Sequence, residues 1–195
     1  MHIWFTSDEH VGHRNACFGW GNPDKARPFT GVDDMREGLI RNHNEVVKTG
    51  DMVFHLGDIF WRSVSKEDAL DYMDRLHGRH FYIRGNHEEA FEKYPALESR
   101  FHWIKDRYFL NGMDGGPKYG IVLDHFSGRV WNKSGQGSWQ LYGHSHNELE
   151  SREDSKSLLS CDVGVDSWGM YPVSLEQIAE VMRVKKEYRD GNTGD

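Results

Sequence analysis

Four short polar segments of this chain combine carboxylate, amide and imidazole side chains, which are donors that bind metal ions in proteins. They are Asp8-Glu9-His10, Gly57-Asp58, Gly85-Asn86-His87-Glu88 and Gly143-His144-Ser145-His146, and a single His125 lies between the last two. Asp8 and His10 are one residue apart, as are His144 and His146, so each pair can face one side where a strand ends. The two oxygens of the Asp58 carboxylate can bridge two ions. The pattern predicts a metal centre and favours one with two ions.

Each of the four segments follows a short apolar run that is typical of a β-strand. These runs are residues 3–6, 52–54, 81–83 and 141–142. In open α/β sheets, the loops at the carboxyl ends of the strands meet at one edge, where ligands bind. Such an edge would gather the polar side chains into one site.

Helical spacing of apolar residues separates the strands of the first half. A helix is predicted to begin at Asp33 or Asp34, because Asp34 and Glu37 resemble a capping box. A second helix is predicted to follow Ser65 as its N-cap and to end at Gly78. The order strand, helix, strand implies a right-handed parallel crossover.

The second half contains strand candidates separated by Gly-rich turns, at residues 108–110, 119–123, 140–142 and 161–165. Little helix intervenes, so we expect mainly antiparallel pairing there. Ser174 and Gln177 form another predicted capping box, which would begin a final helix. Residues 10–32 form a long loop, and long loops of compact domains are often functional.

Length and composition favour one globular domain over residues 1–188, with a polar tail at 189–195 that is expected to fray. The net charge of −7 argues against a broad surface for duplex nucleic acid, but bound cations could still attract phosphate. Cys17 and Cys161 lack CxxC spacing, which favours free thiols in the cytoplasm. No apolar run approaches the roughly 18 residues that a membrane span needs.

Taken together, the five segments resemble the motifs of the calcineurin-like metallophosphoesterase superfamily, which run DxH, GD, GNH(D/E), H and GHxH. The matches extend from Asp8 to His146. Residues 6–10, 27–29 and 166–174 also resemble small single-domain bacterial and phage phosphoesterases. The resemblance implies an α/β fold, a four-layer α/β/β/α sandwich of two mixed β-sheets flanked by helices, with a two-metal site along one edge of the sheets.

The resemblance also implies a role for each residue of the motifs. One metal would be held by Asp8, His10, Asp58 and His146, and the other by Asp58, Asn86, His125 and His144. His87 would be the catalytic imidazole near the leaving group, and Glu88 would help to orient it. The segment after His125 lacks the proline that relatives often carry, and His102 is a weaker substitute for this ligand.

The chemistry expected of such a centre is phosphoester hydrolysis. Two ions lower the pKa of a shared water and hold the phosphate for in-line attack by a bridging hydroxide, and His87 can protonate the leaving oxygen. Nitrogen and oxygen ligands without thiolate favour Mn²⁺, with Fe, Zn²⁺ and Ni²⁺ as alternatives. A phosphodiester, nucleotide-derived or a nucleic-acid end, is the favoured substrate. A phosphomonoesterase and a non-catalytic metal-binding scaffold of the same fold are the alternatives.

Several other residues are candidates for contacts with substrate, although for each a packing or surface role is more common. His13 could reach the substrate or a metal ligand, whereas His55 is expected to be structural. The arginines that could clamp phosphate are Arg27, Arg62 and Arg84. The aromatic residues that could stack on a nucleobase are Trp20, Phe29, Trp61 and Trp131.

Overall fold

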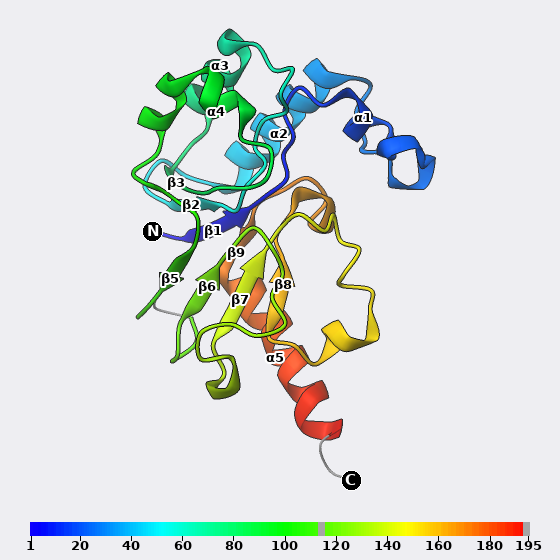
Figure 1. Cartoon of the computed structure of the whole chain (residues 1–195), viewed down its shortest axis with the longest axis vertical. Helices are drawn as coiled ribbons and strands as arrows, with labels where there is room; N and C mark the ends of the chain where they lie inside the picture. Colours follow the sequence, from blue (N-terminus) through cyan, green and yellow to red (C-terminus); the bar gives the residue numbers. More distant parts are fainter. Residues whose placement is uncertain (113–115, 193–195) are drawn as a thin grey trace.

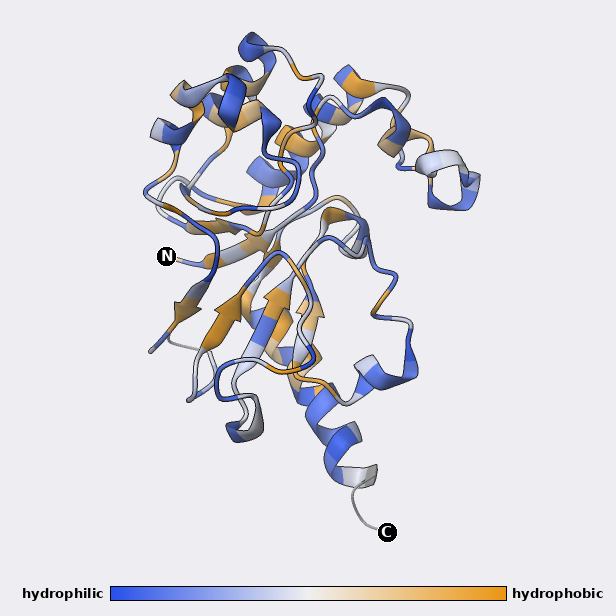
Figure 2. Ribbon diagram, viewed as in Figure 1, coloured by the Kyte–Doolittle hydropathy of each residue, from blue (hydrophilic) through white to orange (hydrophobic). Residues whose placement is uncertain are grey.

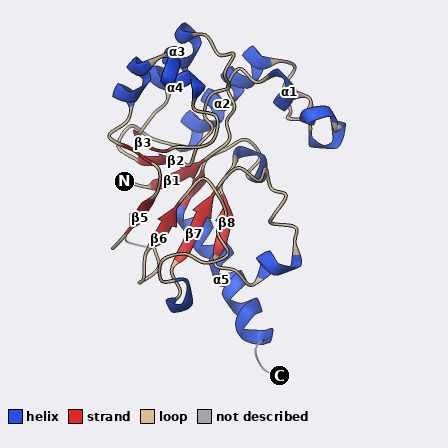
Figure 3. Cartoon of the chain, viewed as in Figure 1, coloured by secondary structure: helices blue, strands red, loops and turns tan. Residues whose placement is uncertain are grey.

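Two facing β-sheets flanked by helices make up the fold (Figures 1 and 3). The computed structural model describes residues 1–112 and 116–192. The predicted architecture of two mixed sheets flanked by helices is therefore confirmed. The final helix continues to Asn192, beyond residue 188, where the domain was expected to end, and residues 193–195 of the predicted tail lie outside the described part.

The first sheet has five strands in the order β4-β3-β2-β1-β9. Its strands are β1 (Ile3–Thr6), β2 (Met52–His55), β3 (Arg79–Ile83), β4 (Ile104–Lys105) and β9 (Val173–Ser174). The first four strands run parallel, and β9 pairs with β1 in the antiparallel direction. The parallel crossover predicted between the second and third strands is confirmed.

The second sheet has four strands in the order β5-β6-β7-β8. They are β5 (Tyr108–Leu110), β6 (Ile121–Leu123), β7 (Trp139–Tyr142) and β8 (Ser160–Asp162). The expectation of mainly antiparallel pairing is wrong, since β6, β7 and β8 run parallel and the antiparallel pair is β5 with β6. The long segments 124–138 and 143–159 return the chain across the sheet, as a parallel connection requires.

Four α-helices and several short 3₁₀ turns complete the described part of the chain up to the last strand. The α-helices are α1 (Arg14–Cys17), α2 (Val32–Val46), α3 (Lys66–Arg75) and α4 (Glu89–Lys93). The 3₁₀ turns η1 (Gly19–Gly21) and η2 (Pro23–Lys25) lie in the loop after β1. After β9, α5 (Leu175–Asn192) packs against β8, β9 and β1.

Two hydrophobic clusters hold the layers together. The first joins α2, α3 and α4 to one face of the first sheet, through residues such as Leu39, Tyr72 and Phe91. The second fills the space between the sheets and reaches α5, through residues such as Phe5 and Leu141. Figure 2 shows hydrophobic residues concentrated on the strands, whereas the far end of α5 is mostly hydrophilic.

Local capping signals were predicted with mixed success. The Ser65 hydroxyl accepts from the Asp68 amide, and Ser174 and Gln177 exchange the two bonds of a capping box. The capping box at Asp34 is wrong, because α2 begins one residue before Asp33 and the Asp34 carboxylate accepts instead from Thr30. Helix α3 also ends at Arg75 rather than at Gly78.

Neither cysteine forms a disulfide, and both Cys17 and Cys161 are buried as free thiols. Among residues 1–112 and 116–192, no helix combines the length and the apolar character needed to cross a membrane.

Candidate metal centre

The candidate metal ligands lie beyond the carboxyl ends of parallel strands from both sheets. Asp8 follows β1, Asp58 follows β2 and Asn86 follows β3, whereas His125 follows β6 and His144 follows β7. A parallel bridge between Ser7 and Gly164 joins the first sheet to the loop after β8. The predicted edge is thus formed by strands of both sheets.

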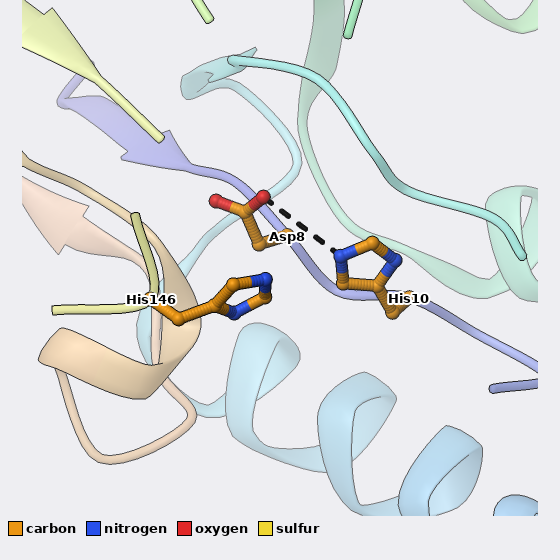
Figure 4. Close-up of side chains that lie close together, drawn as sticks. All are labelled: Asp8, His10 and His146. Atoms are coloured by element: carbon orange, nitrogen blue, oxygen red, sulfur yellow. Dashed lines mark ion pairs between the residues drawn. The ribbon is translucent and has the colours of Figure 1, made fainter. Parts of the chain in front are cut away.

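One group of candidate ligands contains Asp8, His10 and His146 (Figure 4). One ligand atom from each residue lies within 4.8 Å of the others. The dashed line in Figure 4 joins the Asp8 carboxylate to His10 Nε2, at 3.9 Å. Asp8 and His10 are almost fully buried, so the group is closed to solvent on their side.

A second group contains Asp58, His125 and His144, again with one ligand atom each within 4.8 Å of the others. The Asn86 amide oxygen lies 3.0 Å from His125 Nε2 and therefore joins this group. The structure brings His125 to the site, whereas the ring of His102 stacks on Phe81.

Asp58 lies between the two groups. Its Oδ2 is 3.8 Å from His10 Nε2 and 3.5 Å from His125 Nε2. Its Oδ1 accepts hydrogen bonds from the backbone amides of Asn86 and His87, both at 2.9 Å. One oxygen therefore fixes the loop after β3, and the other faces a histidine from each group.

The backbone at the candidate ligands is left-handed. Asp8, His10, Asp58, His144 and His146 have φ angles between 46° and 66°. Such angles are uncommon for residues other than glycine, and they cluster at functional sites. The sequence suggested that residues one apart face the same side because side chains alternate along an extended strand. The left-handed backbone shows that this alternation does not set their direction, and His144 and His146 belong to different groups.

The donor atoms fit bound cations. The Nδ1–H of His125 donates to the Leu56 carbonyl at 2.7 Å, so in the neutral ring the lone pair of Nε2 faces the oxygens of Asn86 and Asp58. Two oxygens and a nitrogen lone pair that point together need a positive charge between them. In the second group a proton on His125 can supply this positive charge. Burial lowers the pKa of His125, but the hydrogen bond to Asp58 and the charge of Asp8 outweigh burial and raise the pKa to about 9.

The first group shows the same need for a cation. Asp8 Oδ1 is buried and has no hydrogen-bond partner among the described residues, whereas Oδ2 accepts from the His144 amide at 2.8 Å. Burial raises the pKa of Asp8 to about 7. A cation beside this oxygen would favour the ionised carboxylate, as opposite charges do for buried acids.

Two glycines leave room for the carboxylates. A Cβ atom at Gly85 would lie 2.0 Å from Asp58 Oδ1, and one at Gly143 would lie 2.5 Å from Asp8 Oδ2. The glycines that precede Asn86 and His144 are therefore part of the site, because any side chain there would displace a candidate ligand.

His87 lies at the edge of the centre, outside both groups. Its Nε2 is 4.0 Å from Asp58 Oδ2, and its side chain is 30% exposed. The ring packs against Trp61, with 4.5 Å between ring centroids. Glu88 does not orient this ring as expected: its Oε1 accepts from the Tyr82 hydroxyl and the Gly85 amide, and its Oε2 has no partner among the described residues. Through these hydrogen bonds Glu88 instead stabilises the loop that carries His87.

Arg27 is buried, contrary to the expectation of a surface arginine. Its guanidinium donates to the carbonyls of Asp8 and Glu9, both at 2.7 Å, and to both oxygens of Asp166 at 2.9 and 2.8 Å. Asp166 also accepts from Nδ1 of His146 at 2.7 Å. With Nδ1 engaged, Nε2 of His146 is directed to the first group, as is usual for metal-bound histidines.

Asp162 and Asp166 hold the segment of the candidate ligands in place, and sequence reasoning missed this role of both. Asp162 is fully buried and accepts from the Ser145 hydroxyl and the Asn147 amide, so it holds the loop that presents His144 and His146. Both aspartates lie at or just after the carboxyl end of β8. The rule that found the ligands, polar residues after a strand, would have found Asp166, which follows the predicted strand at residues 161–165, but not Asp162, which lies within that predicted strand.

The remaining candidates have separate roles. His13 stacks on Trp61, with centroids 3.7 Å apart, beside the first group. His55 is structural, as expected, because its ring bonds to Glu9 and His80 in the core. Phe29 and Trp131 pack against the hydrophobic clusters. Arg62 lies over the Trp61 ring, and Arg84 forms an exposed pair with Asp106.

Comparison with known proteins agrees with this geometry. The family model described as calcineurin-like phosphoesterase matches residues 1–162. The chain belongs to the calcineurin-like phosphoesterase family. Membership and the two groups of histidine and aspartate side chains together support metal binding by this family member.

Relatives of similar length are known. The chain is 29% identical to the uncharacterized protein MJ1445 of Methanocaldococcus jannaschii, over 97% of this chain and 96% of that protein. It is 29% identical to the Gene 66 protein of Mycobacterium phage D29, over 85% and 88% of the two chains. The crystal structure of AQ665 from Aquifex aeolicus, a protein of unknown function, has the same fold, with a TM-score of 0.70, 22% identity and coverage of 92% and 98%.

Proposed function

We propose that this protein hydrolyses phosphodiesters with two divalent metal ions. The observation that carries the proposal is the arrangement around Asp58. Two groups of candidate ligands meet at its carboxylate, and His87 lies 4.0 Å from the same oxygen without joining either group. A two-metal centre with a separate imidazole at its edge suits transfer of a phosphoryl group to water.

The residues present would hold one ion through Asp8, His10, Asp58 and His146, and the other through Asp58, Asn86, His125 and His144. Bound ions would supply Lewis acidity, a water of lowered pKa and positive charge for the phosphate. We propose Mn²⁺, because the donors are nitrogens and oxygens without thiolate. The substrate would be a phosphoester small molecule or nucleotide.

The chain itself positions a proton donor. The His87 amide is fixed by Asp58 Oδ1, and its ring is supported by Trp61, while almost a third of the side chain stays open to a substrate. An imidazole there can protonate the leaving oxygen. The alkoxide released from an alkyl ester is a poor leaving group and gains most from this proton, so His87 suits alkyl phosphoesters, among which we propose diesters.

The proposal is tested by Mn²⁺-supplemented turnover of an alkyl phosphodiester and an alkyl phosphomonoester. His87→Ala should lower diester turnover by about 10²-fold, the usual contribution of an acid–base group, without changing the metal content. His102→Ala is the matched control, because this exposed histidine stacks on Phe81 away from the site.

Three results would contradict parts of the proposal. Unchanged turnover in His87→Ala would remove the role of His87. Faster turnover of the monoester would reverse the preference. Two bound ions without turnover of either ester would make the protein a scaffold.

A further inference from the structure

A cavity of about 1110 Å³ opens beside the metal centre. One wall is the loop at residues 19–28, which includes η1 and η2, and the other is the loop at residues 144–151. The candidate ligands His144 and His146 line it. A substrate held at the metal centre by its phosphate therefore has this space beside it. The volume slightly exceeds the range of about 300–1,000 Å³ that is typical of ligand pockets.

Trp20 supplies an aromatic surface in the cavity. This residue lines the cavity and is 38% exposed, and its ring centroid lies 4.5 Å from that of His146. The guanidinium carbon of Arg27 lies 5.5 Å from the ring centroid. The ring is thus held beside a candidate metal ligand and still presents surface to the cavity.

The backbone holds Trp20 there at a cost. Its φ is 53° and its ψ is 32°, a left-handed conformation that is unfavourable by about 1–2 kcal/mol for a residue with a side chain. Gly19 and Gly21 on either side also have positive φ, and a Cβ atom at Gly19 would lie 2.6 Å from the Ala26 nitrogen. Such strain persists where the surrounding structure imposes it, and it clusters at ligand sites.

Trp20 differs in this respect from the other aromatic residues proposed for stacking. Phe29 and Trp131 pack against the hydrophobic clusters, and one face of Trp61 is covered by the His13 ring. None of these three residues lines the cavity. Of these four aromatic residues, Trp20 is therefore the one that lines the cavity beside the metal centre.

The charged side chains that line the cavity favour a small ligand over a nucleic-acid strand with several phosphates. Its lining carries three carboxylates, from Asp24, Glu148 and Asp166, against two cations, from Lys25 and Arg27. Lys25 pairs with Glu148 across the two walls, and Arg27 is bound to Asp166. These paired charges leave no basic track for further phosphates, which single-stranded nucleic acids require. The cavity suits a ligand whose phosphate lies at the metal centre.

We propose that the cavity binds the organic group of the substrate and that Trp20 stacks on a planar aromatic ring in it, as in a nucleoside. The substrates would then be small nucleoside phosphoesters. This inference rests on the proposed function, because the metal centre must hold the phosphate.

The test compares the binding of adenosine 5′-monophosphate and ribose 5-phosphate to the Mn²⁺-loaded protein by calorimetry. The two ligands share the phosphate and the ribose, so their difference reports the base. Stacking on an aromatic residue contributes about 1–3 kcal/mol, which is about 5- to 150-fold in affinity. The nucleotide should therefore bind at least 5-fold more tightly to the wild-type protein.

Trp20→Ala should abolish this preference and leave the binding of ribose 5-phosphate unchanged, and Trp20→Phe should keep part of it. Phe18→Ala is the matched control, since Phe18 is 47% exposed in the same loop and does not line the cavity. The melting temperature and the Mn²⁺ content of each variant verify that it is folded and loaded with metal. If Trp20→Ala does not fold or does not bind Mn²⁺, the binding measurements on Trp20→Phe test the role of Trp20.

Different failures point to different causes. A preference for the nucleotide that survives in both Trp20 variants would overturn the role of Trp20. Equal binding of the two ligands to the wild-type protein would overturn the aromatic specificity alone. Failure of both ligands to bind the Mn²⁺-loaded protein would instead overturn the proposed function. Tighter binding of an oligothymidine than of the mononucleotide would overturn the restriction to small substrates.

Discussion

Replacement of Asp166 by asparagine tests the idea that this carboxylate positions the first group of ligands. The change keeps the shape of the side chain and removes its charge. Three hydrogen bonds depend on that charge, two from Arg27 and one from His146 Nδ1. The pKa of Asp166 lies well below its usual value: burial opposes this shift, but the bond from His146 and the charge of Arg27 outweigh it. The ionised form is therefore the one that holds the network.

The size of the effect follows from burial. The Arg27 side chain is 0% exposed, so Asp166→Asn leaves a buried guanidinium without its counter-charge. Loss of one partner from a buried pair costs about 3–5 kcal/mol. The carbonyls of Asp8 and Glu9 still accept from Arg27, so we expect the lower end, about 3 kcal/mol. His146 also loses its orienting acceptor, which typically weakens metal binding by about 10- to 100-fold.

Urea denaturation in the presence of a chelator measures the first effect, and Mn²⁺ titration of the folded variant measures the second. Asp106→Asn is the matched control: its carboxylate pairs with Arg84 at 3.2 Å, but the side chain is 89% exposed, so neither measurement should change. An unfolding free energy of Asp166→Asn within about 0.5 kcal/mol of wild type, the range of ordinary surface substitutions, would refute the role of the buried pair. Unaltered Mn²⁺ affinity would refute the positioning of His146.

Three further changes test other parts of the structure. Gly85→Ala should weaken Mn²⁺ binding by at least about 10-fold, since its Cβ would lie 2.0 Å from Asp58 Oδ1, whereas Gly135→Ala, with no atom within 4 Å of its Cβ, should bind Mn²⁺ normally. Burial lowers the pKa of His43 to about 3, so the unfolded chain binds a proton that the folded protein excludes, and stability should fall as the pH drops from about 6.5 towards 3. His43→Gln should make that fall shallower by up to about 1.4 kcal/mol per pH unit in urea titrations, and an unchanged slope would contradict this account. Ser174→Ala should lower the free energy of unfolding by about 1 kcal/mol, measured by urea denaturation, because it removes one bond of the capping box; an unchanged value would mean that the cap adds nothing.

Much of the site could be predicted because its residues follow strands. Apolar runs bounded by glycine mark the strands, and the polar side chains after them mark the edge of the sheet. Ser65 and the pair of Ser174 and Gln177 were also recognisable, since each cap is a contact between residues three apart. Arg27 was not, because its partners Asp8, Glu9 and Asp166 are brought to it by the fold, and burial of a charged residue depends on such partners.

The sequence alone determined the set of donor residues, the strands they follow and the resemblance to the family. The tertiary structure decided the direction of β6, β7 and β8, which run parallel and so carry His125 and His144 to the edge that holds Asp8 and Asp58. Antiparallel neighbours would place successive strand ends at opposite edges. The tertiary structure also decided that His144 and His146 belong to different groups, because their backbone angles are left-handed. Local sequence encodes which side chains can bind, but strand direction and backbone angle arise from contacts between distant segments.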